Sequence, residues 1–343
     1  MKKVVLGLSG GVDSALTAAL LKEKGYFVTG VYLENGSGGK DDAMRVANDL
    51  GIDFAAVDVR EDLEKYVISP FIEGYLKGIT PIPCIACNPA VKFKKLFDFA
   101  DGIRAEFVAT GHYACVNRSD SGEMLLQKAA SKNDQSYMLY RLPKEYINRL
   151  LLPLGVYASK DDVRADAEKK GIHIAKKSDS MEICFIPNDD HGAFIESRMP
   201  DLPKGNFVDE SGKVLGCHGG IYKYTVGQRR GLGISAASRL FVTDIDPESG
   251  DITLSDKDVY RDFITVSDGN IIFDRYRELS EFDCMCKIRH SKTEYPAHVR
   301  ASGEAFEVFF KTPSRAPSPG QSAVFYDGNT VIGGGYIEKY KNK

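Results

Sequence analysis

The segment Ser9–Ser14, with the sequence Ser-Gly-Gly-Val-Asp-Ser, lies between a short apolar run and a helical pattern, as phosphate-binding loops do. Its glycines allow a tight turn, so that free amides at the start of the next helix can face an anion. Ser9 and Ser14 add hydroxyl donors. The loop has neither a Walker A ending nor the G-x-G-x-x-G of a dinucleotide site. The pattern predicts phosphate binding without γ-phosphate transfer; a plain glycine turn with a serine cap is the alternative.

A C-x-x-C pair, Cys84 and Cys87, lies in the proline-rich segment Thr80–Asn88, which we expect to be a loop. This segment leads into a basic stretch, Val91–Ala100, whose pattern is typical of a helix. The pair therefore places two thiols next to several lysines, and thiol chemistry is a better explanation than a disulfide framework.

A third cysteine, Cys184, lies in the segment Lys176–Pro187, which begins with two lysines. A thiolate next to lysines has a lowered pKa and is a better nucleophile, so the sequence predicts reactive thiols in both segments. A four-cysteine zinc site is weakly supported, because no second C-x-x-C exists. We expect packing roles for the remaining cysteines, which are Cys115, Cys217, Cys284 and Cys286.

The charge of the chain is close to balanced, with 45 Lys and Arg against 48 Asp and Glu, a net charge of −3. By itself this balance argues against nucleic-acid binding. Two windows nevertheless contain no acidic residue, Gly74–Phe97 and Ser211–Thr243, and both hold several lysines or arginines. They predict local positive surface, either for RNA or for another phosphate ligand.

The chain has 343 residues, of which 43% are hydrophobic, enough to form more than one core. It has no apolar run of about 18 residues, which argues against a spanning helix and a membrane partner. Seven cysteines without a recognisable signal peptide indicate a reducing compartment, so we expect a cytoplasmic protein.

Strand and helix patterns alternate along residues 1–190, which predicts an α/β fold with a doubly wound parallel sheet. The strand patterns are Lys3–Leu8, Phe27–Leu33, Phe54–Val59 and Glu106–Ala109. The helical patterns are Val12–Lys24 and Asp41–Leu50. The Ser9–Ser14 loop therefore joins the first strand to the first helix.

The second half of the chain changes to short β patterns separated by glycines, prolines and turn residues. Residues 191–258 predict a small central β-rich domain, with strands at Asn206–Val208, Tyr222–Thr225, Leu240–Thr243 and Ile252–Leu254. Residues 259–343 predict a C-terminal β-barrel, with strands at Gly269–Ile272, Phe282–Ile288, Tyr295–Arg300, Ala305–Phe310, Ser322–Tyr326 and Val331–Gly335.

The loop Ser9–Ser14 resembles the PP-loop of the ATP-pyrophosphatase superfamily, whose domain has an adenine-nucleotide alpha-hydrolase-like fold. The resemblance implies that the protein splits ATP into AMP and pyrophosphate and adenylates a carbonyl oxygen. Ser9, Gly10, Gly11, Asp13 and Ser14 would then hold the pyrophosphate end of ATP. Asp13 would position the loop or a Mg²⁺ ion that bridges phosphate oxygens.

Eight segments in the same order resemble one family closely, the tRNA-specific 2-thiouridylases of the bacterial MnmA and mitochondrial TrmU type. The resemblance covers nearly the whole chain. The segments are Ser9–Ser14, Thr80–Asn88, Ala109–Tyr113, Asn133–Tyr140, Lys176–Ile186, Thr225–Ile234, Pro319–Tyr326 and Gly333–Ile337.

The resemblance implies an enzyme that replaces O2 of the wobble uridine with sulfur in tRNAs for Lys, Glu and Gln. ATP would adenylate that oxygen, and a persulfide on Cys184, charged by a sulfur-relay protein or a cysteine desulfurase, would deliver the sulfur. Cys87 matches the second catalytic cysteine of the family, which attacks the persulfide. A transient Cys87–Cys184 disulfide would result.

The resemblance also implies binding residues. The ATP-contacting positions are Gly7, Leu8, Ser9, Gly10, Gly11, Val12, Asp13, Ser14, Leu33 and Gly111. The segment that would touch the target base is Ile82, Pro83 and Cys84. The tRNA contacts would be Asn133, Asp134, Gln135, Arg289 and His290. The residues alone allow a plain polar turn at 133–135.

The chain departs from the family pattern at Cys84, where the family usually has an aspartate. A third thiol suggests a further hypothesis, that Cys84, Cys87 and Cys184 hold a 4Fe–4S cluster whose fourth iron carries hydrosulfide. Leu33 replaces a frequent methionine, and His290 replaces a tyrosine that follows Arg289 in the family. Histidine can still stack on a base.

Two other functions remain alternatives. A PP-loop ligase or amidotransferase acting on a small molecule would need neither the three cysteines nor the basic windows. A tRNA-binding or iron-sensing protein with a decayed site would need no intact Ser9–Ser14 loop.

Overall fold

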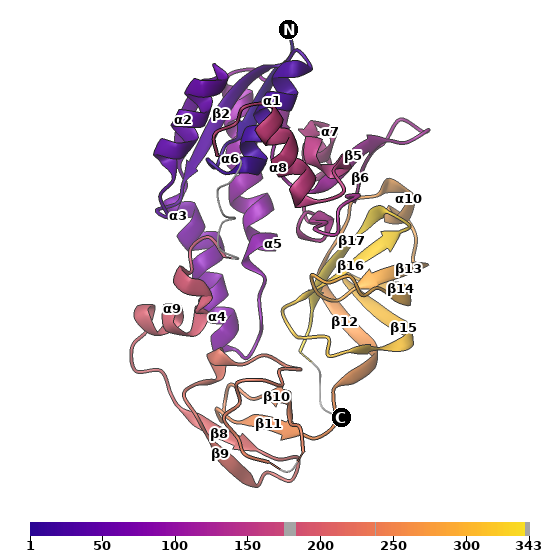
Figure 1. Ribbon diagram of the computed structural model, residues 1–343. Coiled ribbons are helices and arrows are strands. Elements are labelled where there is room, and N and C mark those ends of the chain that lie inside the picture. The colour runs from indigo at the N-terminus through magenta and orange to yellow at the C-terminus, as the bar shows by residue number, and fades with distance from the viewer. Residues whose placement is uncertain (175–182, 237, 340–343) are drawn as a thin grey trace. The chain divides into compact units, whose positions relative to one another are not determined.

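The apolar runs of the first half of the chain form a five-stranded parallel sheet in the order β3-β2-β1-β4-β7 (Figure 1). The computed structural model describes residues 1–174, 183–236 and 238–339. The strands are β1 (Lys3–Gly7), β2 (Phe27–Glu34), β3 (Asp53–Asp58), β4 (Phe107–Ala109) and β7 (Leu150–Leu151). The prediction of an α/β fold with a doubly wound parallel sheet is confirmed.

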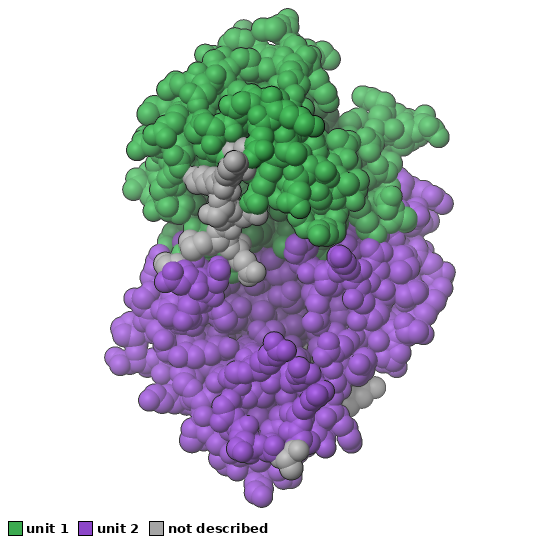
Figure 2. Space-filling view, viewed as in Figure 1, with its two compact units in different colours: residues 1–67, 84–185, 328–332 green, residues 68–83, 186–327, 333–343 purple. Residues whose placement is uncertain are grey.

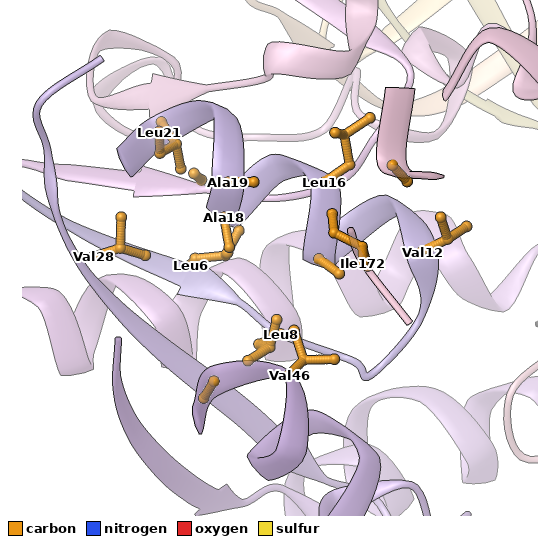
Figure 3. Close-up of a cluster of buried hydrophobic side chains, with 14 of the residues drawn as sticks. Leu6, Leu8, Val12, Leu16, Ala18, Ala19, Leu21, Val28, Val46 and Ile172 are labelled. Carbon is orange, nitrogen blue, oxygen red and sulfur yellow. The ribbon is translucent and has the colours of Figure 1, made fainter. Parts of the chain in front are cut away.

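The central strand β1 is buried on both faces, as expected for a parallel sheet covered by helices. Val4, Val5 and Leu6 are fully buried. Leu6 belongs to a cluster that joins this strand to the first two helices and includes Leu16 and Val46 (Figure 3). The helices of this part of the chain are α1 (Val12–Glu23), α2 (Lys40–Leu50), α3 (Arg60–Leu63), α6 (Phe93–Gly102), α7 (Lys144–Asn148) and α8 (Lys160–Lys169).

The strand order reverses at β1, which has β2 on one side and β4 on the other. In a doubly wound sheet, the loops at the carboxyl ends of two such strands open a crevice in which ligands bind. Residues 8–11 follow β1 and residues 110–113 follow β4. The topology therefore places two of the predicted motifs at this switch point.

The chain divides into two compact units, neither of which is a single stretch of sequence (Figure 2). The first unit comprises residues 1–67, 84–185 and 328–332, and the second comprises 68–83, 186–327 and 333–343. The first unit also contains a hairpin of β5 (Ala114–Arg118) and β6 (Met124–Lys128), whose Gln127 pairs with Thr330. The boundaries 1–190, 191–258 and 259–343 stay a prediction.

The second unit contains two β structures. A four-stranded sheet in the order β10-β11-β8-β9 packs around Phe207, Val242 and Ile252. Its strands are β8 (Gly205–Val208), β9 (Val214–His218), β10 (Phe241–Ile245) and β11 (Ile252–Ser255).

The other β structure is a barrel, because strands β12-β15-β14-β13-β16-β17 close through pairing of β12 with β17. Its strands are β12 (Tyr260–Ile271), β13 (Glu281–Lys287), β14 (Tyr295–Ser302), β15 (Ala305–Arg315), β16 (Ser322–Asp327) and β17 (Thr330–Ile337). The helices of this unit are α4 (Ser69–Leu76), α9 (His191–Arg198) and α10 (Asp274–Arg277), and α5 (Pro83–Cys87) begins at its edge. The predicted central β-rich part and C-terminal barrel are thus confirmed as fold elements.

Two local predictions were wrong. The C-x-x-C segment is helical in α5, because Pro83 occupies the first helical position, where a missing N–H costs nothing. The helix predicted over Val91–Ala100 is confirmed: its first two residues end a π-helical turn, Asn88–Lys92, and the rest lie in α6. The strand predicted over Tyr222–Thr225 is a 3-10 turn, in which the Tyr222 hydroxyl donates to Glu196 and to the Gly219 carbonyl.

Within the described residues, every helix is too short or too polar to cross a membrane.

A stability prediction follows from the turn that precedes α8. A Cβ on Gly155 would lie 2.1 Å from the carbonyl oxygen of Ala114 and 2.6 Å from the sulfur of Cys115. Gly155→Ala should therefore lower the free energy of unfolding by about 1–3 kcal/mol, measured by urea denaturation.

Gly102→Ala is the matched control, because a Cβ on this helical glycine meets no heavy atom within 4 Å. Alanine there should leave stability unchanged or raise it by up to about 1 kcal/mol. Equal stability of the two variants would contradict the packing described for Gly155.

Candidate functional site

Two positions at the Ser9–Ser14 loop have space only for glycine: Gly10 within the loop and Gly111 in the segment after β4. Gly10 has φ +75°, and a Cβ there would lie 2.8 Å from the amide nitrogen of Ala43 at the start of α2. On the other side, a Cβ on Gly111 would lie 3.0 Å from the carbonyl carbon and the Cβ of Asp13. The backbones of three segments therefore approach one another closely here, and a side chain at Gly10 or Gly111 would collide with a neighbouring segment.

The two serines of the loop hold its turn in shape. Ser14 Oγ accepts from the amide of Ser9 at 3.2 Å and donates to the carbonyl of Gly11 at 3.0 Å. The two hydroxyl oxygens lie 3.2 Å apart. Gly11, the N-cap of α1, makes no side-chain cap, so the first-turn amides of that helix have no capping acceptor. A helix N-terminus of this kind suits the phosphates of a nucleotide.

Asp13 is held from two sides. Lys160 Nζ lies 2.6 Å from Asp13 Oδ2, and the Tyr113 hydroxyl donates to Asp13 Oδ1 at 2.8 Å. Neither partner is among the site residues predicted from the sequence. Tyr113 lay inside a quoted motif, whereas Lys160 is 147 positions away from Asp13 and no pattern pointed to it.

The segment after β2 adjoins the loop. Leu33, in β2, is half-buried and pairs with Val57 of β3. The Tyr32 hydroxyl donates to the Gly38 carbonyl at 2.6 Å, and a Cβ on Gly39 would lie 3.7 Å from the Ser9 carbonyl oxygen. Residues 34–39 therefore border the loop at its α2 side.

The thiols near this loop do not have the lowered pKa values that the sequence predicted. Burial raises the pKa of Cys87 to about 11, and it also raises the pKa of Cys184, although the side chain of Cys184 reaches solvent. The lysines expected to act, Lys176 and Lys177, lie outside the described residues. Burial therefore outweighs nearby positive charge at both thiols.

One lysine does oppose this effect. The positive charge of Lys92 lowers the pKa of both Cys87 and Cys184, and the Lys92 backbone amide also bonds to the Cys87 sulfur. A hydrogen bond from the Asn35 side chain acts in the same direction on the pKa of Cys184. Lys92 ends the π-helical turn after Cys87, and such turns often occur at functional sites.

The third thiol, Cys84, is half-buried on the same helix as Cys87. A negative charge on Cys84 would raise the pKa of both Cys87 and Cys184, so the three sulfurs lie within electrostatic reach of one another. Residues 1–174, 183–236 and 238–339 contain no group of three His, Cys, Asp or Glu side chains arranged to hold a metal ion. The thiols form a cluster without a preformed metal geometry.

The segment 133–135 is fastened to the same unit. The carboxylate of Asp134 accepts from the backbone amides of Ala129 and Ser136, at 2.9 and 3.1 Å. Gln135 exchanges hydrogen bonds with the backbone of Tyr113, which connects this turn to Asp13. Asn133 is exposed, so it is the member of the three that faces solvent.

Asn88, the residue after Cys87, connects the helix α5 to the 3-10 turn Ser136–Met138. Its Nδ2 donates to the carbonyl of Met138 at 2.8 Å, and its side chain is 1% exposed. This bond fixes the backbone directly after Cys87.

The remaining predicted residues belong to the second unit. Ile82 and Pro83 follow Thr80, whose backbone bonds to Pro319 at 2.8 Å and to the Gln321 side chain at 2.9 Å. These hydrogen bonds hold the backbone at Thr80, two residues before the predicted target-base segment. Arg289 donates to the carbonyls of Arg315 and Ala316, so part of its guanidinium holds the end of β15, and His290 is exposed.

The structure brings the loop, the three thiols, Leu33, Gly111 and the 133–135 turn into the first unit, whereas Ile82, Pro83, Arg289 and His290 belong to the second.

Three family models match the sequence. The tRNA methyl transferase HUP domain matches residues 2–188, and the tRNA methyl transferase PRC-barrel domain matches residues 192–256. The aminomethyltransferase beta-barrel domain matches residues 261–337. Together they cover most of the chain.

Named relatives match over nearly their full length. The tRNA-specific 2-thiouridylase MnmA of Clostridium botulinum strain Eklund 17B is 41% identical over 98% of both chains. The protein of that name from Clostridium acetobutylicum is 42% identical, over 98% of this chain and 99% of its own length. The NMN synthetase of Francisella tularensis, a solved structure, aligns over 52% of this chain and 66% of its own, with 18% identity and a TM-score of 0.33. From the first two matches, this chain belongs to the tRNA-specific 2-thiouridylase family.

Proposed function

We propose that this protein is an ATP-dependent tRNA uridine 2-sulfurtransferase, which adenylates O2 of a wobble uridine and replaces that oxygen with sulfur. The observation that carries the proposal is that the Ser9–Ser14 loop belongs to the same compact unit as three thiols, of which Cys84 and Cys184 each raise the pKa of Cys87. Membership of the 2-thiouridylase family supports the same reaction.

The Ser9–Ser14 loop is proposed to hold the phosphates of ATP. The residues fit this ligand, because Gly10 and Gly111 leave a cradle that a Cβ would fill and α1 begins without a cap. Leu33 and Gly111 would contact the nucleotide, and Asp13 would position the loop or a Mg²⁺ ion. Binding at this helix N-terminus would stabilise the negative charge of the departing pyrophosphate.

Sulfur transfer is assigned to Cys184 and Cys87. Cys184 is exposed and can accept sulfur from a cysteine desulfurase or a sulfur-relay protein as a persulfide. The Cys87 thiolate then attacks Cys184 Sγ, breaks the S–S bond and releases hydrosulfide, which attacks C2 of the adenylated uridine and displaces AMP. The enzyme is left with a Cys87–Cys184 disulfide, and a cellular thiol reduces it for the next cycle.

The RNA partner is proposed to be tRNA for Lys, Glu or Gln, bound in the cytoplasm. Asn133 and His290 are exposed, which suits contacts to RNA, and Ile82, Pro83 and Cys84 are proposed to face the target base. Asp134, Gln135 and Arg289 would act mainly by holding these contacts in place, because their side chains already bond to the protein backbone.

The basic windows contribute unequally to this proposal. Lys94 and Lys95 in the first window form ion pairs with Asp98 and Asp62, which reduces their attraction for phosphate. In the second window, Arg229 and Arg230 are exposed. We therefore assign the electrostatic attraction for RNA mainly to the second window.

Cys84 supports a second route for the sulfur. With Cys87 and Cys184 it supplies three thiols, the number needed to hold a 4Fe–4S cluster with one open iron. When bound, such a cluster would supply an iron that carries hydrosulfide. The two routes differ in what they require of Cys84, which the persulfide route does not use.

The function is tested with purified protein, ATP, a persulfide donor and unmodified tRNA. AMP and pyrophosphate should form only with tRNA present, and nucleoside mass analysis should detect 2-thiouridine. Asp13→Ala should reduce pyrophosphate release by about a hundredfold or more, because the loop loses its carboxylate, while tRNA affinity stays nearly unchanged.

Asp49→Ala serves as the control, since Asp49 pairs with His173 away from the loop and is 53% exposed. Pyrophosphate release that needs no tRNA would favour the small-molecule ligase instead. Full turnover by the Asp13 variant would remove the loop from the mechanism.

The two sulfur routes are separated by Cys84→Ser. Under the persulfide route this variant should retain most activity, whereas Cys87→Ser and Cys184→Ser should abolish it. Under the cluster route all three variants should be equally inactive and should lose iron after anaerobic reconstitution. Iron and labile sulfide are counted in the wild type and in each variant; thiolation by iron-free wild type would end the cluster hypothesis.

The thiol environment predicts a pH dependence. Because the pKa of Cys87 is raised to about 11, its alkylation by iodoacetamide should speed up steadily from pH 7 to about pH 10. Lys92→Met removes the charge that lowers the pKa, so alkylation at pH 8 should be slower by about three- to tenfold. Lys94→Met, which breaks only an exposed ion pair with Asp98, should leave the rate unchanged. Equal rates in both variants would exclude the role of Lys92.

A further inference from the structure

Two ion pairs join helices α1 and α8, one near each end of the contact. Lys160, the first residue of α8, pairs with Asp13 in the first turn of α1, with a Nζ–Oδ2 distance of 2.6 Å. Lys170, the C-cap of α8, pairs with Glu23, the last residue of α1, at 2.5 Å. One ion pair between these helices therefore lies at the Ser9–Ser14 loop, and the other lies at the opposite end of α1.

The loop-side pair is the more enclosed of the two. The side chain of Asp13 is 30% exposed, whereas that of Glu23 is 56% exposed. Asp13 has a second fixed partner in the hydroxyl of Tyr113, which is 4% exposed, and Lys160 Nζ lies 5.8 Å from the centre of the Tyr113 ring. The Lys160 ammonium is therefore positioned by Asp13 of α1 and by Tyr113, which follows β4, as well as by its own helix.

Charge at the loop argues against a purely structural role for Lys160. The N-terminus of a helix carries partial positive charge, so a cation placed beside it is unfavourable unless an anion is also present. Lys160 lies at the N-terminus of α1, where Asp13 supplies one negative charge, and Asp161 and Asp162 follow Lys160 in the first turn of α8. A polyphosphate bound on the loop would bring several more negative charges within reach of the same ammonium.

We propose that Lys160 is a phosphate-binding residue of the nucleotide site, held on Asp13 while no nucleotide is bound. When ATP occupies the loop, the ammonium donates to oxygens of the phosphates that leave as pyrophosphate, and the Asp13 carboxylate becomes available to Mg²⁺. The proposal rests on ATP binding by this loop and is independent of how sulfur is delivered. It adds a residue from α8 to a site otherwise built from the loops after β1, β2 and β4.

The test measures binding by titration calorimetry without tRNA, so that it does not depend on thiolation. Lys160→Met should weaken the binding of Mg²⁺–ATP and of pyrophosphate by about ten- to a hundredfold, as expected for loss of a charge-assisted hydrogen bond. AMP, which lacks the leaving phosphates, should change by less than about threefold. Lys160→Arg should restore most of the affinity.

Lys170→Met is the matched control, because it removes the other ion pair between the same helices. Exposed ion pairs contribute little, so it should leave both affinities unchanged. Thermal unfolding of all variants identifies any loss of folding. The proposal is overturned if folded Lys160→Met binds ATP like the wild type, if Lys170→Met loses as much affinity, or if AMP binding falls as much as ATP binding.

A measurement on the unaltered protein covers the case in which Lys160→Met fails to fold. Saturating pyrophosphate should slow the acetylation of Lys160 by acetic anhydride and leave Lys170 unaffected, as measured by peptide mass analysis. Unchanged labelling of Lys160 would also overturn the proposal, whereas failure of pyrophosphate to bind at all would instead contradict the proposed function.

Discussion

The arrangement of the first unit depends on close backbone packing around the loop between β1 and α1. Gly10 and Gly111 each occupy positions where a Cβ would lie within about 3 Å of a neighbouring backbone. Such a close approach requires the carboxyl ends of adjacent parallel strands to meet at one edge, which the order β3-β2-β1-β4-β7 provides. Lys160 reaches this loop from α8, a helix that packs against α1.

The thiols of this unit are under opposing demands. Burial raises the pKa of Cys87 and so disfavours its thiolate, which is the form that the proposed attack on Cys184 would use. Lys92 partly offsets this effect through both its charge and its backbone amide. The π-helical turn explains the geometry, because its wider ring brings the residue five positions on back toward the cysteine.

The sequence was sufficient for β1, β2 and β3 and for the loop, because apolar runs and a glycine-serine turn leave local signatures. It missed the strands β5, β6, β7 and β9. The sequence did not predict the features that depend on tertiary contacts. The prolines around Cys84 indicated a loop, yet Pro83 starts a helix. The pKa of Cys87 depends on burial, which charge patterns along the chain do not report. Lys160 and Asp13 are brought together by helix packing, and their spacing of 147 residues has no periodicity to detect.

The first unit includes residues 328–332, which are far in sequence from the rest of that unit. Gln127 of β6 pairs with Thr330, its side chain bonds to the Thr330 hydroxyl at 3.0 Å, and Lys128 bonds to the Asn329 carbonyl at 2.8 Å. During synthesis, the edge of the β5–β6 hairpin therefore stays without this partner until some two hundred further residues have left the ribosome. An uncovered strand edge is a template for unwanted pairing, so the nascent chain must bridge a span of some two hundred residues before its nucleotide-binding half is complete.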